Sequence, residues 1–275
     1  MLDELRHLAL IATHGSFTEA ARRAGLSQPA LSASIARLEE EMGARLFFRG
    51  AGGTRLTAAG EALLPRARAA LAAVEDGRRA VAEIAGLRAG EVRLGGGATV
   101  CTFFLPPVLT AFRRDHPGIV LKLREGVASE VRAAVDAGEL DLGLVPSSED
   151  GEPWLTDELI VVAAPGIDAS TAPFVTFSPG YSTRQLLERH IPGARVVMEL
   201  SGVAAVLAFV RAGVGVSLVS RVAVAADLER GALVEARRPE TPIRRELALI
   251  HRGVERLSPA AAAVRRRLLS SRVSA

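Results

Sequence analysis

Small residues, several with hydroxyl groups, follow three apolar runs of the chain at points where helices are expected to begin. The runs are VRLGGG (residues 92–97), LKLREG (121–126) and RVVMEL (195–200). The residues that follow them are Thr99, Val100, Cys101, Thr102, Ser129, Ser201 and Gly202. The first turn of a helix exposes unpaired N–H groups and the positive end of the helix dipole, so converging helix starts form an anion site. For any one of these residues, an ordinary helix cap is the alternative interpretation.

No combination of residues in the sequence has the spacing of a catalytic or metal site. Cys101 is the single cysteine, and no second cysteine or local histidine motif frames it. The five histidines, at positions 7, 14, 116, 190 and 251, lack metal-ligand spacing, and no G-x-S-x-G or Walker motif occurs. The glycines at 95–97 lack the full G-x-G-x-x-G spacing of a dinucleotide site. We therefore expect a protein that is not an enzyme and that uses no metal or cofactor.

Two short helices joined by a glycine turn are predicted near the N-terminus, after a first helix at 2–14. In GSFTEAARRAGLSQPALSASIARLE (residues 15–39), Ser16 and Ser27 occupy helix-capping positions, and Gly25 suits the left-handed turn between the helices. This pattern is typical of a helix-turn-helix, whose second helix enters the major groove of DNA. Small side chains on that helix allow close approach, and Gln28 is able to pair with adenine. A generic small helical bundle is the alternative interpretation.

A glycine-rich loop framed by arginines follows the two helices. The run RLFFRGAGGTRL (residues 45–56) is typical of the wing of a winged helix, although a charged hairpin on any surface has a similar composition. The candidate DNA-contacting residues of the whole segment are Thr18, Ser27, Gln28, Pro29, Ser32, Ser34, Arg37, Arg49 and Arg55. Of these, Gln28, Ser32 and Ser34 are predicted to face base edges. Thr18, Arg49 and Arg55 are predicted to contact phosphates.

One long helix is predicted over residues 58–88. Its apolar residues recur at three- and four-residue spacing and are Leu64, Ala67, Leu71, Val74, Val81 and Ala85. Such a stripe is typical of a coiled-coil-like seam, so we expect the helix to pair with a second copy of the chain.

From residue 91 onward, short apolar runs alternate with amphipathic segments. Helices are predicted near 103–114, 129–138, 181–190, 202–212, 221–230 and 259–270, between runs typical of strands. This alternation indicates an α/β fold with parallel strands and ligand crevices at their carboxyl ends. About 150 residues of such alternation are enough for two lobes of similar plan.

Composition and charge narrow the class of protein. Of 275 residues, 49% are hydrophobic and 24% are charged, which suits two or three folded domains. The net charge is +2 over residues 1–88, −6 over 89–236 and +7 over 237–275, so the overall basic balance does not by itself argue for nucleic acid. The N-terminus carries charges in its first turns, and no apolar run reaches about 18 residues, so we expect no signal peptide and no membrane span. With a single cysteine, these features favour a cytoplasmic protein.

The whole chain resembles the LysR-type transcriptional regulators. The match is strongest in GSFTEAARRAGLSQPALSASIARLEEEMGARLFFRGAGGTRLTAAGEALL, and HPGIVLKLREG, AGELDLGLV and LAFVRAGVGVSLVS match landmarks of the family's effector domain. The resemblance implies an α/β multidomain protein. It places a winged helix-turn-helix at 1–58, a dimerising linker helix at 59–88, and a two-lobed effector-binding domain, similar to periplasmic binding proteins, at 89–275. The first lobe is expected to contain 89–160 and 248–275, and the second lobe 163–245.

The same resemblance implies partners and a ligand site. It predicts a homodimer, or a homotetramer built as a dimer of dimers, on a double-stranded DNA operator with dyad symmetry, and RNA polymerase is a further candidate partner. It also predicts a small-molecule effector, frequently a carboxylate-bearing metabolite, in the cleft between the lobes. The candidate effector-binding residues are Thr99, Val100, Cys101, Thr102, Ser129, Pro146, Ser201 and Gly202. Phe177, Ser178 and Tyr181 are further candidates for the wall that the second lobe contributes.

Two other classes of protein fit part of the sequence. An enzyme on a doubly wound fold needs a convergent nucleophile or acid–base set, which these residues do not supply. A small-molecule carrier fits the second half, but it is expected to have a signal peptide and leaves residues 16–57 without a role. The sequence therefore favours a DNA-binding regulator that responds to a small molecule.

Overall fold

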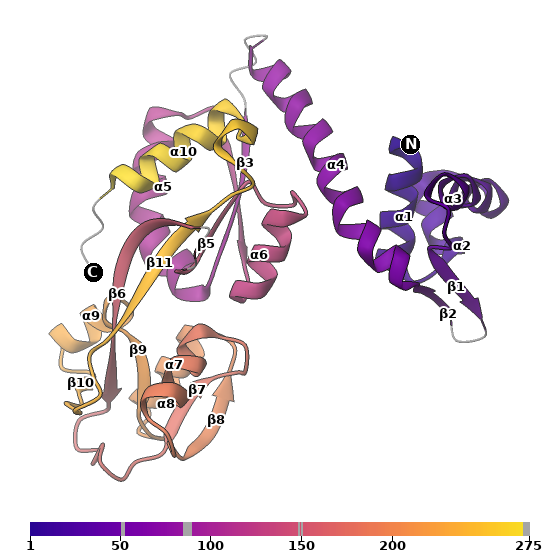
Figure 1. Cartoon of the computed structure of the whole chain (residues 1–275). Coiled ribbons are helices and arrows are strands. Elements are labelled where there is room, and N and C mark those ends of the chain that lie inside the picture. The colour runs from indigo at the N-terminus through magenta and orange to yellow at the C-terminus, as the bar shows by residue number, and fades with distance from the viewer. Residues whose placement is uncertain (51–52, 85–89, 148, 150, 272–275) are drawn as a thin grey trace. The chain divides into compact units, whose positions relative to one another are not determined.

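The structure is a computed structural model that describes residues 1–50, 53–84, 90–147, 149 and 151–271 (Figure 1). Contacts divide the chain into two compact units, an N-terminal unit mainly within residues 1–86 and a C-terminal unit within 87–275. No helix in the described part of the chain is long and apolar enough to cross a membrane.

The N-terminal unit combines helices with one two-stranded hairpin. Its elements are α1 (Leu2–His14), α2 (Phe17–Ala24), α3 (Gln28–Met42), β1 (Phe47–Gly50), β2 (Gly53–Leu56) and α4 (Ala58–Ile84). Ser16 caps α2 by accepting a hydrogen bond from the Glu19 backbone N–H, and Gly25 ends α2 with a φ of 69°, a conformation that favours glycine. The predicted helix-turn-helix and hairpin are therefore confirmed as structural elements.

The first half of α4 packs on its own unit. Ala67 is 1% exposed within the core of the N-terminal unit, and Leu64 and Leu71 pack against that core. These residues were expected in a seam with a second copy, so the structure shows a different role for them. Val81, further along α4, is 67% exposed, whereas Ala85 lies outside the described residues. The core of the N-terminal unit therefore continues past the expected domain boundary at residue 58 into α4.

The C-terminal unit alternates strands and helices, as the sequence predicts. Its first elements are β3 (Glu91–Gly96), η1 (Val100–Phe104), α5 (Leu105–Asp115), β4 (Val120–Glu125), α6 (Ala128–Asp136), β5 (Leu142–Pro146) and β6 (Glu152–Ala163). They are followed by β7 (Phe174–Phe177), α7 (Ser182–His190), β8 (Val196–Leu200), α8 (Val203–Arg211), β9 (Ser217–Ser220) and α9 (Arg221–Glu229). The last elements are β10 (Val234–Glu235), β11 (Ile243–Ile250), η2 (Val254–Arg256) and α10 (Pro259–Ser270).

Two long antiparallel strands, β6 and β11, run through both lobes of this unit (Figure 1). The sheet order is β10-β6-β11-β5-β3-β4, with β9 also paired to β6, and β3 is parallel to both β4 and β5. We call the first and second lobes lobe I and lobe II. In lobe I, α5 and α10 cover one face of the sheet and α6 covers the other. In lobe II, α8 and α9 share one core and α7 contributes to another.

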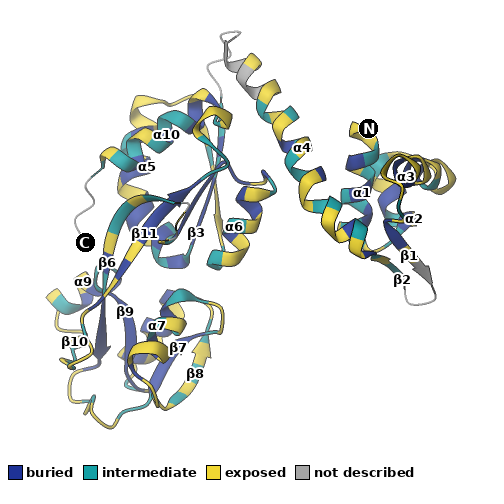
Figure 2. Ribbon diagram, in the orientation of Figure 1, coloured by how far each residue is buried: buried dark blue, intermediate teal, exposed yellow. Residues whose placement is uncertain are grey.

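The expected boundary between the lobes needs a small correction. Leu159 and Ile160, expected in the first lobe, pack in the cores of lobe II, and Leu247, expected outside it, packs in the core of lobe I. The chain therefore passes between the lobes between Leu155 and Leu159 in β6, and between Ile243 and Leu247 in β11. Figure 2 shows buried residues in both strands, in the second half of β6 and along most of β11.

Two glycines allow α6 to lie close against the sheet of lobe I. A Cβ atom on Gly95 would stand 2.4 Å from the Leu140 side chain. One on Gly143 would stand 2.9 Å from the side chains of Val131 and Ile250. The glycine run that begins at residue 95 therefore has a packing role in this fold.

Candidate functional site

The second helix of the helix-turn-helix, α3, presents small neutral side chains at its N-terminal end. Ser27 caps it by accepting a hydrogen bond from the Ala30 backbone N–H at 3.3 Å, and Pro29 lies in the first turn. Ser27, Gln28 and Pro29 are exposed. Gln28 Nε2 donates to Ser32 Oγ at 3.0 Å, which holds the two polar groups side by side. This arrangement suits the approach of a helix to base edges.

One predicted base contact is wrong. Ser34 is 2% exposed and faces α1, where its Oγ lies 2.7 Å from Nδ1 of His7. Burial lowers the pKa of His7, so the neutral imidazole is favoured in this contact. Ser34 therefore connects α3 to α1, because at this position the side chain points into the unit rather than toward DNA.

Arg37 and Thr18 are exposed, as DNA contacts require. Arg37 donates to Glu4 Oε1 at 3.1 Å while its side chain stays 63% exposed. Hydrogen bonds from the terminal amino group, from the Glu4 backbone N–H and from Arg37 lower the pKa of Glu4 to about 2. Such an exposed ion pair is weak, so Arg37 is able to exchange this partner for a phosphate.

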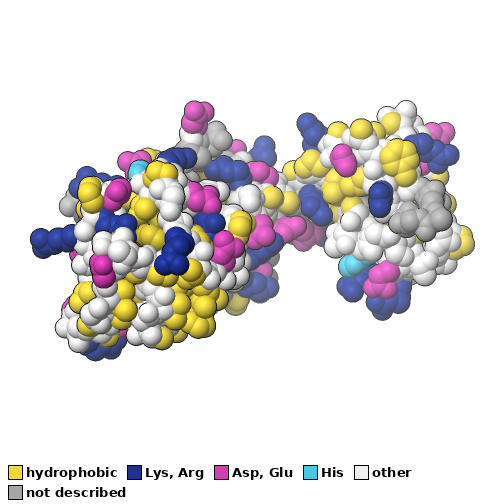
Figure 3. All heavy atoms as spheres, turned by 90° about the horizontal axis from the view of Figure 1, so that it is seen from below, with side chains coloured by type: hydrophobic (Ala, Val, Ile, Leu, Met, Phe, Trp, Pro, Cys, Tyr) yellow, Lys and Arg dark blue, Asp and Glu magenta, His cyan; other side chains and the backbone are white. Residues whose placement is uncertain are grey.

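The hairpin β1–β2 is fixed to the helices behind it. Glu39 of α3 accepts a hydrogen bond from the Leu46 backbone N–H at 2.8 Å, and Thr54 N–H donates to the Gly15 carbonyl at 3.4 Å. Arg55 is exposed on the hairpin. The side chain of Arg49 lies outside what the structure describes. In the view of Figure 3, the Lys and Arg side chains of the described residues are scattered, some of them beside Asp and Glu.

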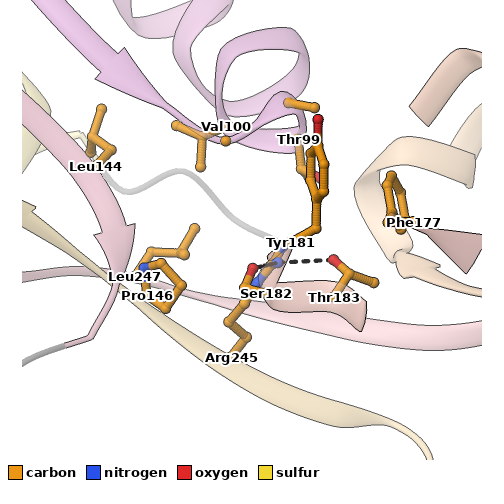
Figure 4. A pocket seen from close by; sticks show the side chains of 12 residues that line it. Thr99, Val100, Leu144, Pro146, Phe177, Tyr181, Ser182, Thr183, Arg245 and Leu247 are labelled. Atoms are coloured by element: carbon orange, nitrogen blue, oxygen red, sulfur yellow. Dashed lines mark hydrogen bonds between the residues drawn. The ribbon is translucent and has the colours of Figure 1, made fainter. Parts of the chain in front are cut away.

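A pocket with a volume of about 40 Å³ lies between the two lobes of the C-terminal unit (Figure 4). Its lining comes from lobe I, from the start of α7 in lobe II, and from the strands that join the lobes. The lining residues are Gly97, Ala98, Thr99, Val100, Leu144, Pro146, Phe177, Tyr181, Ser182, Thr183, Arg245 and Leu247. The volume corresponds to about three water molecules, which is room for a carboxylate-sized group.

A buried arginine connects this pocket to the strands that cross between the lobes. Arg245 is 8% exposed, and its Nη1 donates to Ser182 Oγ at 2.9 Å and to Thr183 Oγ1 at 3.2 Å. Its Nη2 donates to Asp157 at 2.5 Å, and Asp157, 1% exposed, also accepts from Ser220 Oγ at 2.5 Å. Arg245 and Asp157 are register partners in β11 and β6. Among the described residues, nothing accepts a hydrogen bond from Arg245 Nε.

The structure brings together some of the predicted effector-binding residues. Thr99, Val100 and Pro146 line the pocket, as do Phe177 and Tyr181, whose ring centroids are 5.8 Å apart. The predicted residues outside this lining are Cys101, Thr102, Ser129, Ser178, Ser201 and Gly202. Their role in effector binding stays a prediction.

The alternative interpretation, an ordinary helix cap, does not hold for three of the predicted effector-binding residues. The N-cap of α8 is Gly202, so Ser201 precedes the cap. Thr99 makes no side-chain capping bond at the start of η1, and Ser129 lies inside the first turn of α6, at whose start Glu130 accepts from the Val127 N–H. The helix starts are therefore present, and side-chain capping does not explain Thr99, Ser129 or Ser201.

Two family models match the chain. The model described as bacterial regulatory helix-turn-helix protein, lysR family, matches residues 2–61, and the LysR substrate binding domain matches residues 85–272. The HTH-type transcriptional regulator YeiE of Escherichia coli (strain K12) is 32% identical over 278 residues, with 94% of each chain covered. The chain belongs to the LysR family. It is a DNA-binding transcriptional regulator with an effector-binding domain, which confirms the family and fold predicted from the sequence.

Further comparisons agree with a LysR-type regulator along the whole chain. The HTH-type transcriptional regulator CbbR of Rhodospirillum rubrum is 32% identical over 281 residues, covering 96% of this chain and 94% of CbbR. The crystal structure of full-length CbnR complexed with its target DNA covers 98% of each chain at 24% identity, with a TM-score of 0.66. That similarity shows that the two chains share a fold.

Sequence reasoning missed the polar centre of the pocket in this LysR-type regulator. Ser182, Thr183 and Arg245 come from two segments that are about sixty residues apart, and no local motif joins them. A signal was present, because Asp157 and Arg245 are charged residues beside apolar runs typical of buried strands. Two opposite charges in such surroundings predict a buried pair, since an isolated buried charge is very unfavourable.

Proposed function

We propose that the effector of this regulator carries an oxyanion, such as a carboxylate, and that this group binds in the pocket between the lobes. The observation that carries the proposal is the Nε atom of Arg245, a buried N–H donor without an acceptor among the described residues. Buried donors are rarely left unpaired, because such a group loses its hydrogen bond to water. An oxygen atom of a ligand would supply the missing acceptor.

The groups around Arg245 add further donors. Because Ser182 Oγ and Thr183 Oγ1 accept hydrogen bonds from Arg245, their own hydroxyl hydrogens are left to donate. Both residues lie in the first turn of α7, whose N-cap, Tyr181, makes no side-chain capping bond. Asp157 offsets the charge of Arg245, so the attraction for an anion comes from the start of α7 and from the number of donors. An oxyanion accepts hydrogen bonds only, which matches this set.

Effector binding and DNA binding are linked in this proposal by the geometry of the lobes. A ligand that contacts Thr99 in lobe I and the start of α7 in lobe II favours the lobe arrangement in which both contacts form. Because a pocket for a whole metabolite is about 300 Å³ or more, a larger effector binds only when the lobes part. The difference between the effector's binding free energies for the two lobe arrangements is the free energy available to change operator binding.

On the DNA side, we propose that Gln28 and Ser32 read bases while Arg55 contacts phosphate. The operator would have dyad symmetry and the protein would bind it as a homodimer or homotetramer in the cytoplasm, with RNA polymerase as a further partner. The exposed Val81 on α4 supports pairing through the far half of that helix, since the near half packs on its own unit. A helix whose apolar residues recur at three- and four-residue spacing is typical of an interface between copies.

A thermal-shift screen tests the effector proposal. Small carboxylates are compared with the primary amides of the same skeletons, and only carboxylates are expected to raise the melting temperature, because ligand binding stabilises the folded state. For the best carboxylate, Thr99→Val and Ser182→Ala should lose most of the shift. Ser170→Ala and Thr171→Val are the matched controls, because both residues are exposed, lie outside the pocket lining and are not among the predicted effector-binding residues. Equal responses to acids and amides, or loss of the shift only in the two controls, would contradict the proposal.

A further inference from the structure

One aromatic side chain on the DNA-binding unit is not part of its core. The unit contains three aromatic residues, of which Phe17 and Phe47 are buried and pack edge to face with ring centroids 5.5 Å apart. The third, Phe48 in β1, is 65% exposed. Successive side chains of a strand point to opposite faces, so the burial of Phe47 turns Phe48 outward.

The outward face of the hairpin combines this ring with a cation. Phe48 is the register partner of Arg55 in β2, and both side chains are exposed. Directly opposed residues in an antiparallel pair have Cβ atoms about 5 Å apart, so the two side chains leave the hairpin from neighbouring positions on one face. The next pair on the same face is Gly50 and Gly53, which leaves no Cβ atoms there to block a large partner.

We propose that Phe48 binds DNA by packing on deoxyribose carbons of the backbone segment whose phosphate Arg55 contacts. The contents of this face favour DNA over a second protein chain, because an exposed ring beside a cation matches the alternating apolar sugars and anionic phosphates of a nucleic-acid backbone. A protein interface of ordinary kind would surround the ring with further apolar side chains. Here the register partner of the ring is an arginine.

The hairpin is held in a fixed place relative to the recognition helix, so both reach DNA together. Glu39 of α3 accepts from the Leu46 N–H, and Thr57 Oγ1 donates to the Arg45 carbonyl at 2.6 Å, which fixes both ends of the hairpin. The inference rests on the proposed docking of α3 in the groove. The two are separable, because Gln28→Ala changes sequence preference whereas a sugar contact does not.

The test measures binding of the full chain to a fluorescent 30-base-pair duplex of random sequence over a range of salt concentrations. Phe48→Ala should raise the Kd about three- to tenfold, the effect of losing burial of part of one ring. The slope of log Kobs against log salt should stay at its wild-type value, because no ion is released at an apolar contact. Arg55→Ala should instead reduce the magnitude of that slope by about 0.9, the value for one phosphate contact. An unchanged Kd for Phe48→Ala would overturn the proposal.

Matched variants separate DNA contact from folding and from self-association. Phe209→Ala, which truncates a 38% exposed ring in α8 of the other unit, should leave the Kd unchanged. If Phe48→Ala changes the sedimentation coefficient of the DNA-free protein, the face is an interface between copies and the proposal is wrong. In a Trp154→Phe background, which removes the single tryptophan, Phe48→Trp should change its emission when duplex is added. Emission unaffected by saturating duplex would also contradict the DNA contact.

Discussion

The two ligand-facing regions of this regulator hold their polar groups in opposite ways. In the N-terminal unit, Gln28 and Arg37 are exposed, and each has one partner within hydrogen-bonding distance. In the pocket of the C-terminal unit, Arg245 and Asp157 are 8% and 1% exposed, and their partners surround them. The polar groups of the first region are open to solvent, whereas those of the second are closed off and fixed by their partners.

This difference determines what each region contributes to the folded state. Exposed ion pairs and hydrogen bonds contribute little to stability, so their groups are free to exchange water and weak partners for DNA. A buried charge pair is different, because the loss of one partner leaves the other charge without compensation in a medium of low polarity. Substitutions at the DNA-facing surface should therefore change binding, and those at the centre of the pocket should also change folding.

The largest effect is expected at the buried pair. Asp157→Ala leaves Arg245 without its carboxylate, and removal of one partner of a buried pair typically destabilises a protein by about 3–5 kcal/mol. Urea unfolding followed through Trp154, which lies in β6 of the same unit, measures the loss. Asp3→Ala is the control, because Asp3 and Arg6 form an exposed pair whose loss should matter by less than about 1 kcal/mol. Equal destabilisation by both substitutions would remove the contrast between the two regions.

At the DNA-facing surface, Gln28→Ala should change specificity without changing stability. A bidentate contact to a base contributes about 1–3 kcal/mol of discrimination against the wrong base, so the preference for an operator selected from a random library should fall accordingly. Arg55→Ala should weaken binding to selected and scrambled duplexes alike. Both variants should unfold at the wild-type urea concentration. If Gln28→Ala and Arg55→Ala reduce the preference for the selected operator equally, the assignment of base and phosphate contacts is wrong.

How much the sequence predicts differs between the regions for a physical reason. The helix-turn-helix is encoded locally, because Ser16, Ser27 and Gly25 each specify a cap or a turn within a few residues. The pocket joins Thr99, the start of α7 and Arg245, which are far apart in the chain and meet only in the folded lobes. Family resemblance supplied Thr99 and Val100, whereas the charges beside apolar runs indicate only that Arg245 belongs to a buried pair and not that it lines a pocket.

The misplaced Ser34 shows a different kind of error. Leu31, Ile35 and Leu38 of α3 are buried in the core of the N-terminal unit, and Ser34 lies three residues after Leu31 and four before Leu38. Positions i, i+3, i+4 and i+7 share one face of a helix, so the spacing already placed Ser34 inside. Its polar side chain suggested the outer face, yet a small hydroxyl group is readily buried when a partner such as His7 accepts or donates a hydrogen bond.

A smaller effect is expected from Ser34→Ala, which is compared with a substitution on the outer face of the same helix. Loss of the hydrogen bond to His7 should lower the free energy of unfolding of the N-terminal unit by about 1 kcal/mol while the operator preference stays unchanged. Ser32, two residues earlier on the opposite side of the helix, accepts a hydrogen bond from Gln28, so Ser32→Ala should change the operator preference and leave the stability unchanged. Urea unfolding and competition binding on both variants give the comparison. If Ser34→Ala changes base preference as strongly as Ser32→Ala, the buried role of Ser34 is wrong.

The smallest effect is expected at Cys101, which lies next to pocket residues without lining the pocket. Burial, and to a lesser extent the negative charge of Glu125, raise the pKa of its thiol to about 11, while the Gly96 carbonyl accepts from the thiol at 3.5 Å. At pH 7 only about one molecule in ten thousand then carries the thiolate, so an aromatic disulfide reagent should react very slowly with the folded protein. Because the folded state disfavours the thiolate, its stability is unaffected below the unfolded pKa and decreases as the pH rises from about 9 toward 11. The measurement is the pH dependence of the reaction rate in the folded protein and in urea. Rapid modification of the folded protein at pH 7 would show that the surroundings of Cys101 are more polar than the structure indicates. Cys101 would then lie outside the buried surroundings of the pocket.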